Sequence, residues 1–207
     1  MSHPRAHSKR DDLITAALRL FAEKGIKATT VRDIAHEAGV TEGALYRHFE
    51  SKEQLAQALF AECARLFYQR LSTALEGVSG ADNQLCAIVQ GFFGFAETHP
   101  AAYEYVMARH HDDLGALPPE QPLPKDLITH VIQEGIAAGQ LRPLDPELGT
   151  AMIVGICIRT IFFVDRGMIR DDREQVVREV CEALQRVFDI RFPSRRGKRL
   201  PRSVTRT

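Results

Sequence analysis

Between residues 25 and 52 the sequence places helix stops and helix starts so close together that only short helices fit there. Gly25 is expected to end a first helix, because glycine readily adopts the backbone conformation that follows a last helical turn. Thr30 and Thr41 are good N-caps, since a threonine hydroxyl accepts a hydrogen bond from a free backbone N–H. Gly39 separates the two helices that these caps begin. The stretch therefore predicts two short helices joined by a tight turn, which is a helix-turn-helix.

Helical patterns also fill the rest of the chain. Apolar residues recur every three or four positions, and no useful run alternates with the period of two that a half-buried strand shows. Proline and glycine residues interrupt these patterns at intervals. The expected helices are 11–24, 31–38, 42–49, 52–76, 82–97, 101–110, 124–138, 145–166 and 172–189. The sequence therefore predicts an all-α fold.

The formal net charge of zero hides a separation of charge along the chain. Residues 1–52 contain nine basic and seven acidic residues, and residues 191–207 contain seven basic residues and no acidic one. The middle of the chain must therefore carry the balancing acidic excess. Basic ends on an acidic body indicate a polyanionic partner for the ends of the chain.

The expected helix 42–49 has one apolar stripe and one polar side. Each residue advances about 100° around an α-helix, so Leu45 and Phe49 fall on the same, buried side. Arg47 then falls on the opposite side and points outward. The pattern alone fits either a helix that binds a partner or an ordinary surface helix, because any short amphipathic helix shows polar residues on its outer side.

The outer side of this helix suits a DNA major groove, which admits one α-helix. Gly43 and Ala44 lie beside the outward direction and are small enough to let the backbone approach another surface. Tyr46 and His48 lie on the two flanks, from which they reach phosphates on the groove walls. This arrangement predicts a recognition helix.

More DNA contacts are expected at the ends of the neighbouring helices. Thr41 and Glu42 stand at the start of the recognition helix and point into the groove. Lys52 and Thr30 stand at the starts of two other helices, where free backbone N–H groups attract a phosphate. The basic arm "HPRAHSKR" at residues 3–10 is either a minor-groove contact or a solvated terminus.

Two consecutive stretches, "LITAALRLFAEKGIKATTV" and "TTVRDIAHEAGVTEGALYRHFESKEQL", resemble the DNA-binding head of the TetR family of bacterial transcription regulators. The resemblance covers roughly residues 8–60. It implies DNA contacts at the positions typical of the family: Thr30, Thr41, Gly43, Tyr46, His48 and Lys52. It also implies that operator sequence depends on the positions where members vary: Glu42, Ala44 and Arg47.

The resemblance implies a division of the chain into a three-helix DNA-binding head at residues 8–68 and a helical domain for effector binding and dimerisation at 69–192. The basic tail at 193–207 lacks a core-forming pattern, so we expect it to be disordered. The expected protein is a homodimeric repressor that a small, largely apolar effector releases from its operator. A DNA-binding regulator or architectural protein without an effector is the alternative.

Dimerisation is expected through the last two helices, at about 145–166 and 172–189. The first is apolar nearly all round, so it should be covered on several sides. A recognition helix reads only a few base pairs, and such proteins usually dimerise on a palindromic operator. The alternative is that both helices only close the core of a monomer.

An aromatic-rich region lies between the head and the dimer helices. Aromatic residues at helical spacing are usually core, whereas small-molecule sites combine apolar walls with a few polar groups. The family resemblance favours an effector site in this region. The candidate effector residues are Phe67, Phe92, Phe93, Tyr103, Met107, His130, Arg159 and Phe163. Arg159 has a second interpretation, as a side chain at the edge of the dimer.

Other classes of function find little support in the sequence. No Ser/His/Asp set or paired carboxylates indicate an enzyme, and no cofactor motif is present. The cluster "ARHHDD" at 108–113 is interpreted as solvated, not as a metal site. The four scattered cysteines are expected to be reduced core residues. No apolar run reaches about 18 residues, so we expect a cytoplasmic protein without a membrane span.

Overall fold

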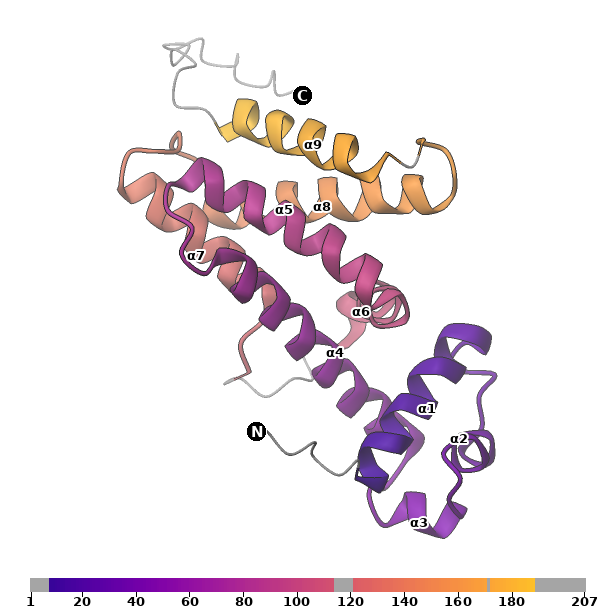
Figure 1. The fold of residues 1–207 in the computed structure, drawn as a ribbon. Coiled ribbons are helices and arrows are strands. Elements are labelled where there is room, and N and C mark those ends of the chain that lie inside the picture. The colour runs from indigo at the N-terminus through magenta and orange to yellow at the C-terminus, as the bar shows by residue number, and fades with distance from the viewer. Residues whose placement is uncertain (1–7, 114–120, 171, 189–207) are drawn as a thin grey trace, which may run out of the picture.

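The computed structural model describes residues 8–113, 121–170 and 172–188. Every regular element within these residues is an α-helix, which confirms the predicted all-α fold (Figure 1). The helices are α1 Lys9–Lys24, α2 Val31–Glu37, α3 Glu42–Tyr46, α4 Lys52–Leu75, α5 Ala81–Thr98, α6 Pro100–Asp113, α7 Pro124–Ala137, α8 Pro146–Asp165 and α9 Arg173–Phe188. The N-terminal arm up to residue 7 and the tail from residue 189 lie outside the described residues.

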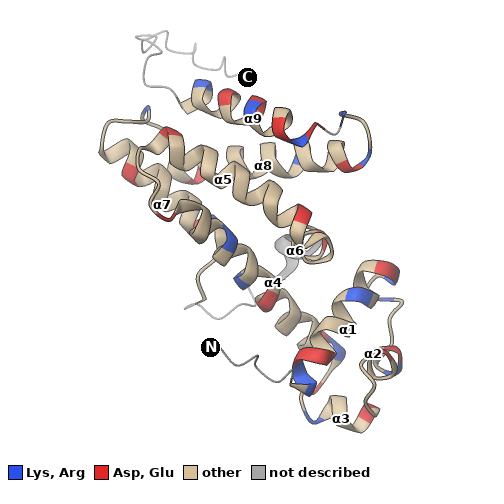
Figure 2. Ribbon diagram, viewed as in Figure 1, with Lys and Arg blue, Asp and Glu red and all other residues tan. Residues whose placement is uncertain are grey.

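The head consists of α1, α2 and α3 packed on the start of α4. Its core is formed by apolar residues that helical spacing brings to the inner sides of these helices. Fully or almost fully buried members include Leu13, Ala17, Ile34, Leu45, Phe49 and Leu55. The charged residues of the head lie on its outside, where both signs are present (Figure 2).

Helix α4 connects the head to the rest of the protein (Figure 1). Its 24 residues span about 36 Å at 1.5 Å per residue. The N-terminal part packs against α1, and the helix also packs against α5, α6 and α7. One continuous helix therefore contacts both the helix-turn-helix head and the interior of the rest of the protein.

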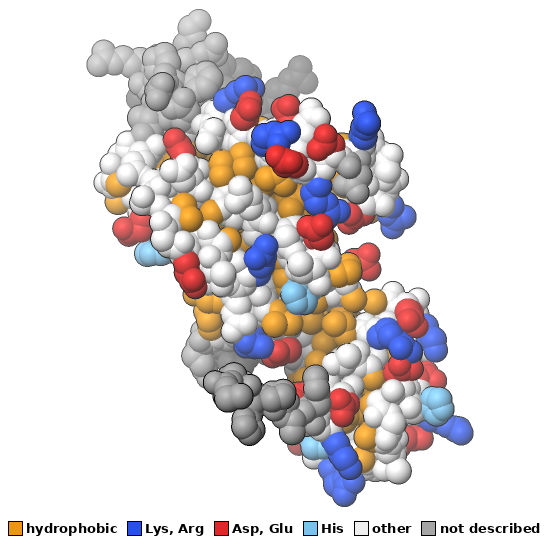
Figure 3. Space-filling model, in the orientation of Figure 1, with side chains coloured by type: hydrophobic (Ala, Val, Ile, Leu, Met, Phe, Trp, Pro, Cys, Tyr) orange, Lys and Arg blue, Asp and Glu red, His pale blue; other side chains and the backbone are white. Residues whose placement is uncertain are grey.

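The body is built around α5, which packs against α4, α6, α7, α8 and α9. Phe67 of α4 forms the centre of an aromatic cluster with two residues of α5. Its ring centroid lies 4.8 Å from that of Phe92, edge to face, and 4.7 Å from that of Phe95, stacked. On the side shown in Figure 3, hydrophobic side chains gather over the middle of the molecule, between the charged outside of α9 and the head.

Helix α8 is apolar enough and long enough to cross a membrane by composition alone, with a mean hydropathy of 1.8 over its most apolar window. In the fold it packs against α5, α7 and α9 instead. Only 33% of that window is buried, and Leu148 and Phe162 are 52% and 38% exposed. The expectation that α8 is covered on several sides is therefore only partly met within one chain.

Candidate functional site

Helices α2 and α3 each begin at a capping threonine. Thr30 accepts a hydrogen bond from the N–H of Asp33 at 3.1 Å, and the Asp33 carboxylate accepts the N–H of Thr30 at 2.9 Å. Thr41 accepts the N–H of Ala44 at 3.2 Å. Gly39 has a φ of 67°, a conformation that glycine adopts without strain. These local bonds explain why the sequence forms two short helices here.

The exposed side of α3 is the one that the sequence indicates. Leu45 is fully buried, whereas Tyr46, Arg47 and His48 are exposed, with Tyr46 at 52%. Gly43 is exposed, and a Cβ built on it meets no atom within 4 Å. Thr30, Thr41 and Glu42 are exposed as well. The polar outer side of α3 is therefore exposed as the sequence indicates, and its contact with DNA stays a prediction.

Two details of this helix differ from the expectation. The helix ends at Tyr46 instead of residue 49, because the N–H of His48 bonds to the carbonyl of Leu45 three residues back and tightens the last turn. Ala44 is buried, with only 6% of its surface exposed, so its placement on the outer face is wrong. Since α3 packs against α2, its buried side is wider than the stripe of Leu45 and Phe49 alone.

The ammonium group of Lys52 is bound within the head. Its Nζ donates to the backbone carbonyls of Ile26 and Thr29, at 3.0 Å each. The side chain is half-buried, and two of its three donors are used in these bonds. The expectation of a phosphate contact overlooked this role, because neither partner is near Lys52 in the sequence. The bonds tie the start of α4 to the loop between α1 and α2.

Replacing Lys52 by methionine is expected to lower the free energy of unfolding of the head by about 1–3 kcal/mol, because two backbone carbonyls lose their donor. Chemical denaturation of the full chain measures this loss. Lys27→Met is the matched control, since Lys27 is exposed in the same loop. Unchanged stability, together with a weaker salt dependence of DNA binding, would support the phosphate contact instead.

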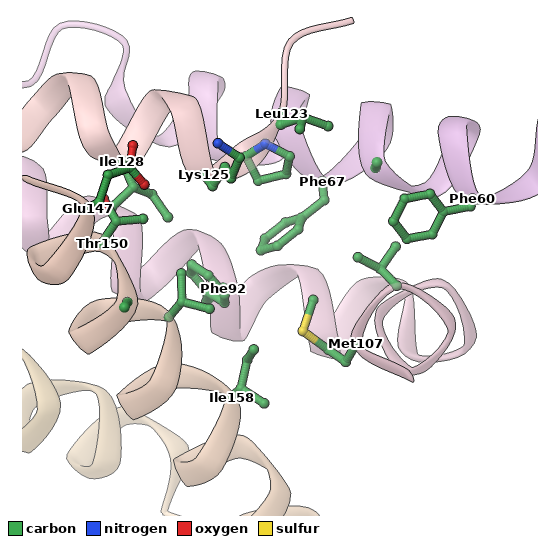
Figure 4. Close-up of a pocket in the computed structure, with 15 residues that line it drawn as sticks. Phe60, Phe67, Phe92, Met107, Leu123, Lys125, Ile128, Glu147, Thr150 and Ile158 are labelled. Atoms are coloured by element: carbon green, nitrogen blue, oxygen red, sulfur yellow. The ribbon is translucent and has the colours of Figure 1, made fainter. Parts of the chain in front are cut away.

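The body contains a mostly apolar cavity of about 270 Å³ between α4, α5, α6, α7 and α8 (Figure 4). Its apolar walls include Phe60, Ala64, Phe67, Phe92, Val106, Met107, Leu123, Pro124, Ile128, Ala151, Val154 and Ile158. The polar lining residues Lys125, Glu147 and Thr150 lie together at one end (Figure 4). The cavity thus has an apolar interior and one polar end, which suits a small amphipathic molecule.

The polar end carries charges of both signs. The ammonium of Lys125 lies 3.0 Å from the carboxylate of Asp126, and this hydrogen bond is the main cause that raises the pKa of Lys125. Glu147 contributes to the same shift through its negative charge. Thr150 donates to the carbonyl of Pro146 and shares a 2.8 Å hydrogen bond with Thr129. A ligand therefore meets both donors and acceptors at this end.

Three of the predicted effector residues, Phe67, Phe92 and Met107, line the cavity, and five do not. Phe93 and Tyr103 are buried in the core, and His130 is exposed on α7. The guanidinium of Arg159 lies 5.2 Å and 5.6 Å from the ring centroids of Phe162 and Phe163, on the outer side of α8. Arg159 and Phe163 were therefore misassigned, because helical spacing alone does not show which side of α8 faces inward.

The polar end of the cavity was not predicted from the sequence. Lys125 and Glu147 each directly follow a proline, Pro124 and Pro146, that begins a helix. Proline at the first helical position is a usable signal for where a helix starts. That signal does not reveal that the first turns of α7 and α8 open onto the same cavity.

Helix α6 links this cavity to the head through consecutive residues. Val106 and Met107 line the cavity. The neighbouring Tyr105 is buried, donates a 3.0 Å hydrogen bond from its hydroxyl to the carbonyl of Ala56, and stacks on Phe21 of α1 with ring centroids 6.0 Å apart. Helix α6 therefore contacts the cavity, α1 and α4 through three consecutive residues.

Within the described part of the chain, the buried hydroxyl of Tyr103 has no hydrogen-bond partner. Burial is also the main cause that raises the pKa of this group above its usual value. Replacing Tyr103 by phenylalanine is expected to leave the free energy of unfolding unchanged or raise it by up to about 1 kcal/mol, because no bond is lost. Chemical denaturation measures it. Tyr105→Phe, which loses the bond to Ala56, should instead cost about 1 kcal/mol, and equal costs for both variants would reveal a partner for Tyr103.

Within the described residues, no group of three or more His, Cys, Asp or Glu side chains is arranged to hold a metal ion. The side chains of residues 108–113, which include the "ARHHDD" cluster, lie outside the description.

A helix-turn-helix head joined by one long helix to an all-helical body with an apolar cavity defines a class of DNA-binding regulators. Residues 13–59 match the family described as bacterial regulatory proteins, tetR family. The HTH-type transcriptional repressor KstR2 of Mycolicibacterium smegmatis is 32% identical over 148 residues, which cover 68% of this chain and 72% of the relative. The chain belongs to the TetR family of helix-turn-helix transcription regulators.

Solved structures support the same fold. The ketosteroid transcriptional regulator KstR2 of Mycobacterium tuberculosis is 26% identical, with a TM-score of 0.63 over 89% of this chain and 97% of that chain. The transcriptional regulator FadR from Bacillus subtilis, solved in complex with stearoyl-CoA, has a TM-score of 0.67 over 84% of this chain and 96% of that chain, at 22% identity. These relatives are transcription regulators, as the sequence analysis predicted for this chain.

Proposed function

We propose that this protein is a homodimeric transcriptional repressor that a small, largely apolar effector releases from a palindromic operator. The observation that carries the proposal is that one helix, α4, lines the cavity with Phe60, Ala64 and Phe67 and also begins inside the head with Lys52. A ligand that alters the packing around α4 thereby alters the position of the head. The protein acts in the cytoplasm, where its DNA is.

In this proposal the outer face of α3 enters the major groove. Tyr46 and His48 bind phosphates on the two groove walls, and Arg47 reads base edges. Gly43 allows the backbone to come close, and Thr30, Thr41 and Glu42 complete the contact surface. The exposure of these side chains supports the assignment.

Dimerisation buries the outer faces of α8 and α9. A groove of about 580 Å³ runs between these helices, lined by Ile156, Thr160 and Ile169 and by Val176, Val180 and Ala183, with polar residues at its rim. Leu148 and Phe162 are further exposed apolar side chains on α8. An apolar surface of this kind is typical of a protein contact. Two chains joined here place two recognition helices on half-sites about 34–36 Å apart.

The effector is an amphipathic molecule that places its apolar part among the aromatic residues and a polar group near Lys125 and Glu147. A cavity of about 270 Å³ holds the equivalent of roughly nine water-sized groups, so a longer ligand must open it further. FadR was solved with stearoyl-CoA, and KstR2 is described as a ketosteroid regulator. Acyl-CoA thioesters of increasing chain length and steroids are therefore suitable first probes.

Footprinting of the protein on the DNA upstream of its own gene tests the operator, and thermal shifts with the two probe classes test the effector. A ligand that stabilises the free protein should also weaken its DNA complex, because an effector shifts the equilibrium only if it prefers the DNA-incompetent state.

Val154→Phe is expected to reduce effector affinity at least tenfold and to leave DNA affinity unchanged, because the larger ring occupies the cavity that Val154 lines from α8. Titration of the DNA complex with the effector measures the response. Leu66→Phe is the control, since Leu66 is half-buried on α4 and does not line the cavity. If no compound of either class weakens the DNA complex, a regulator without an effector is the better description.

A further inference from the structure

Two cysteines from different helices lie against each other in the body. Cys86 of α5 and Cys181 of α9 are 95 positions apart in the chain, and the Sγ of Cys181 lies 3.9 Å from the backbone carbonyl oxygen of Cys86. The side-chain amide of Gln185, one turn further along α9, lies with its Nε2 3.7 Å from the Sγ of Cys86. The two thiols are therefore held together where α5 and α9 pack.

The two thiols differ in environment. Cys181 is buried, and burial, followed by a hydrogen bond with the Cys86 side chain, raises its pKa to about 12. It therefore stays protonated at neutral pH. Cys86 is only half-buried, so small molecules in solution reach it, and its sulfur accepts a hydrogen bond from Gln185. The thiolate is the form of a cysteine side chain that reacts with oxidants.

We propose that Cys86 and Cys181 are a modification site at which hydrogen peroxide forms a reversible intramolecular disulfide. The Cys86 thiolate attacks one peroxide oxygen, the O–O bond breaks, and a sulfenic acid and hydroxide form. The Cys181 sulfur then attacks the Cys86 sulfur, and the S–O bond breaks. The hydroxyl leaves with the Cys181 proton as water. Peroxide is reduced by two electrons, which the two sulfurs supply.

The bond would join two helices with different tasks. Helix α5 lines the cavity with Phe92, and α9 lines the outer groove with Val176 and Val180. A covalent tie over such a long loop restricts the unfolded chain strongly. The oxidised protein should therefore unfold at a temperature about 5–15 °C higher than the reduced protein. The site does not depend on the proposed effector or operator.

The test treats the reduced full chain with hydrogen peroxide, blocks the remaining thiols with an alkylating reagent, and maps the peptides by mass spectrometry. We expect one Cys86–Cys181 peptide pair, an intact mass lower by two hydrogen atoms before alkylation, and full reversal by dithiothreitol. Cys86→Ser and Cys181→Ser should each abolish the bond and the shift in unfolding temperature. Cys63→Ala and Cys157→Ala should retain both, because these buried thiols take no part.

Cys157 provides the sharpest control, because it is buried on α8 near Cys181 and its own pKa is raised, by burial first and by Cys181 second. A Cys157–Cys181 bond, a bond between two chains, or oxidation of Cys86 to a sulfinic acid without a bond would each overturn the proposal. If a serine variant fails to fold, the peptide map of the wild-type chain still decides between these outcomes.

Discussion

Replacing Tyr46 by alanine is expected to weaken DNA binding by the dimer about 10²–10⁴-fold. A hydrogen bond to a charged group contributes about 1.5–3 kcal/mol, and the dimer loses two of them, one in each half-site. Tyr46 is 52% exposed, so the substitution should leave the head folded. Fluorescence anisotropy with the footprinted operator and with an unrelated duplex of the same length measures the loss.

Tyr46→Ala should weaken binding to both duplexes alike, because phosphates carry no sequence information. Tyr46→Phe keeps the ring and isolates the contribution of the hydroxyl. Arg47→Ala provides the contrast, since loss of a base contact changes the preference between sequences by about 1–3 kcal/mol per half-site. If Tyr46→Ala weakens binding to the operator alone, Tyr46 reads bases. The proposed phosphate contact of Tyr46 would then be wrong.

Ile156→Glu is expected to convert the protein to a monomer and to weaken operator binding about 10²–10⁴-fold, because the benefit of linking two half-site contacts is lost. Ile156 is half-buried in a single chain and lines the groove between α8 and α9. A carboxylate there remains solvated in the monomer but would be buried without a partner in the dimer. Sedimentation velocity measures the mass, and anisotropy measures the affinity.

Gln133→Glu is the matched control for this variant, since it adds the same charge at an exposed position of α7 that does not line the groove. It should remain a dimer with unchanged operator affinity. Circular dichroism of both variants checks that helix content is kept. If Ile156→Glu remains a dimer, the contact between the two chains lies elsewhere on the molecule.

Much of the head could be predicted from sequence because its signals are local. Thr30 and Thr41 cap the helices that they precede, and the stripe of Leu45 and Phe49 is buried as the 100° rotation per residue indicates. Ala44 and Lys52 were harder because their surroundings come from other parts of the head. Ala44 is covered in a helix that packs on α2, and Lys52 reaches carbonyls more than twenty positions away.

The cavity could be predicted only in part for the same reason. Phe67, Phe92 and Met107 were found because aromatic and methionine side chains concentrate in the region. Phe93 is also aromatic, but it follows Phe92 on α5 and therefore points in another direction, into the core. Which residues border empty space depends on how five helices pack, and no local pattern records that packing.

The bonds that Lys52 makes also determine how far a small change at the cavity travels. Phe67 and Lys52 lie on the same rigid helix, about 22 Å apart at 1.5 Å per residue. By simple leverage over that length, a tilt of α4 by about 5° at the cavity moves its far end by about 2 Å. The loop bound to Lys52 moves with it. A hydrogen bond to a phosphate is lost once its donor–acceptor distance exceeds about 3.5 Å. A shift of about 2 Å at each head of a dimer is therefore enough to break such bonds.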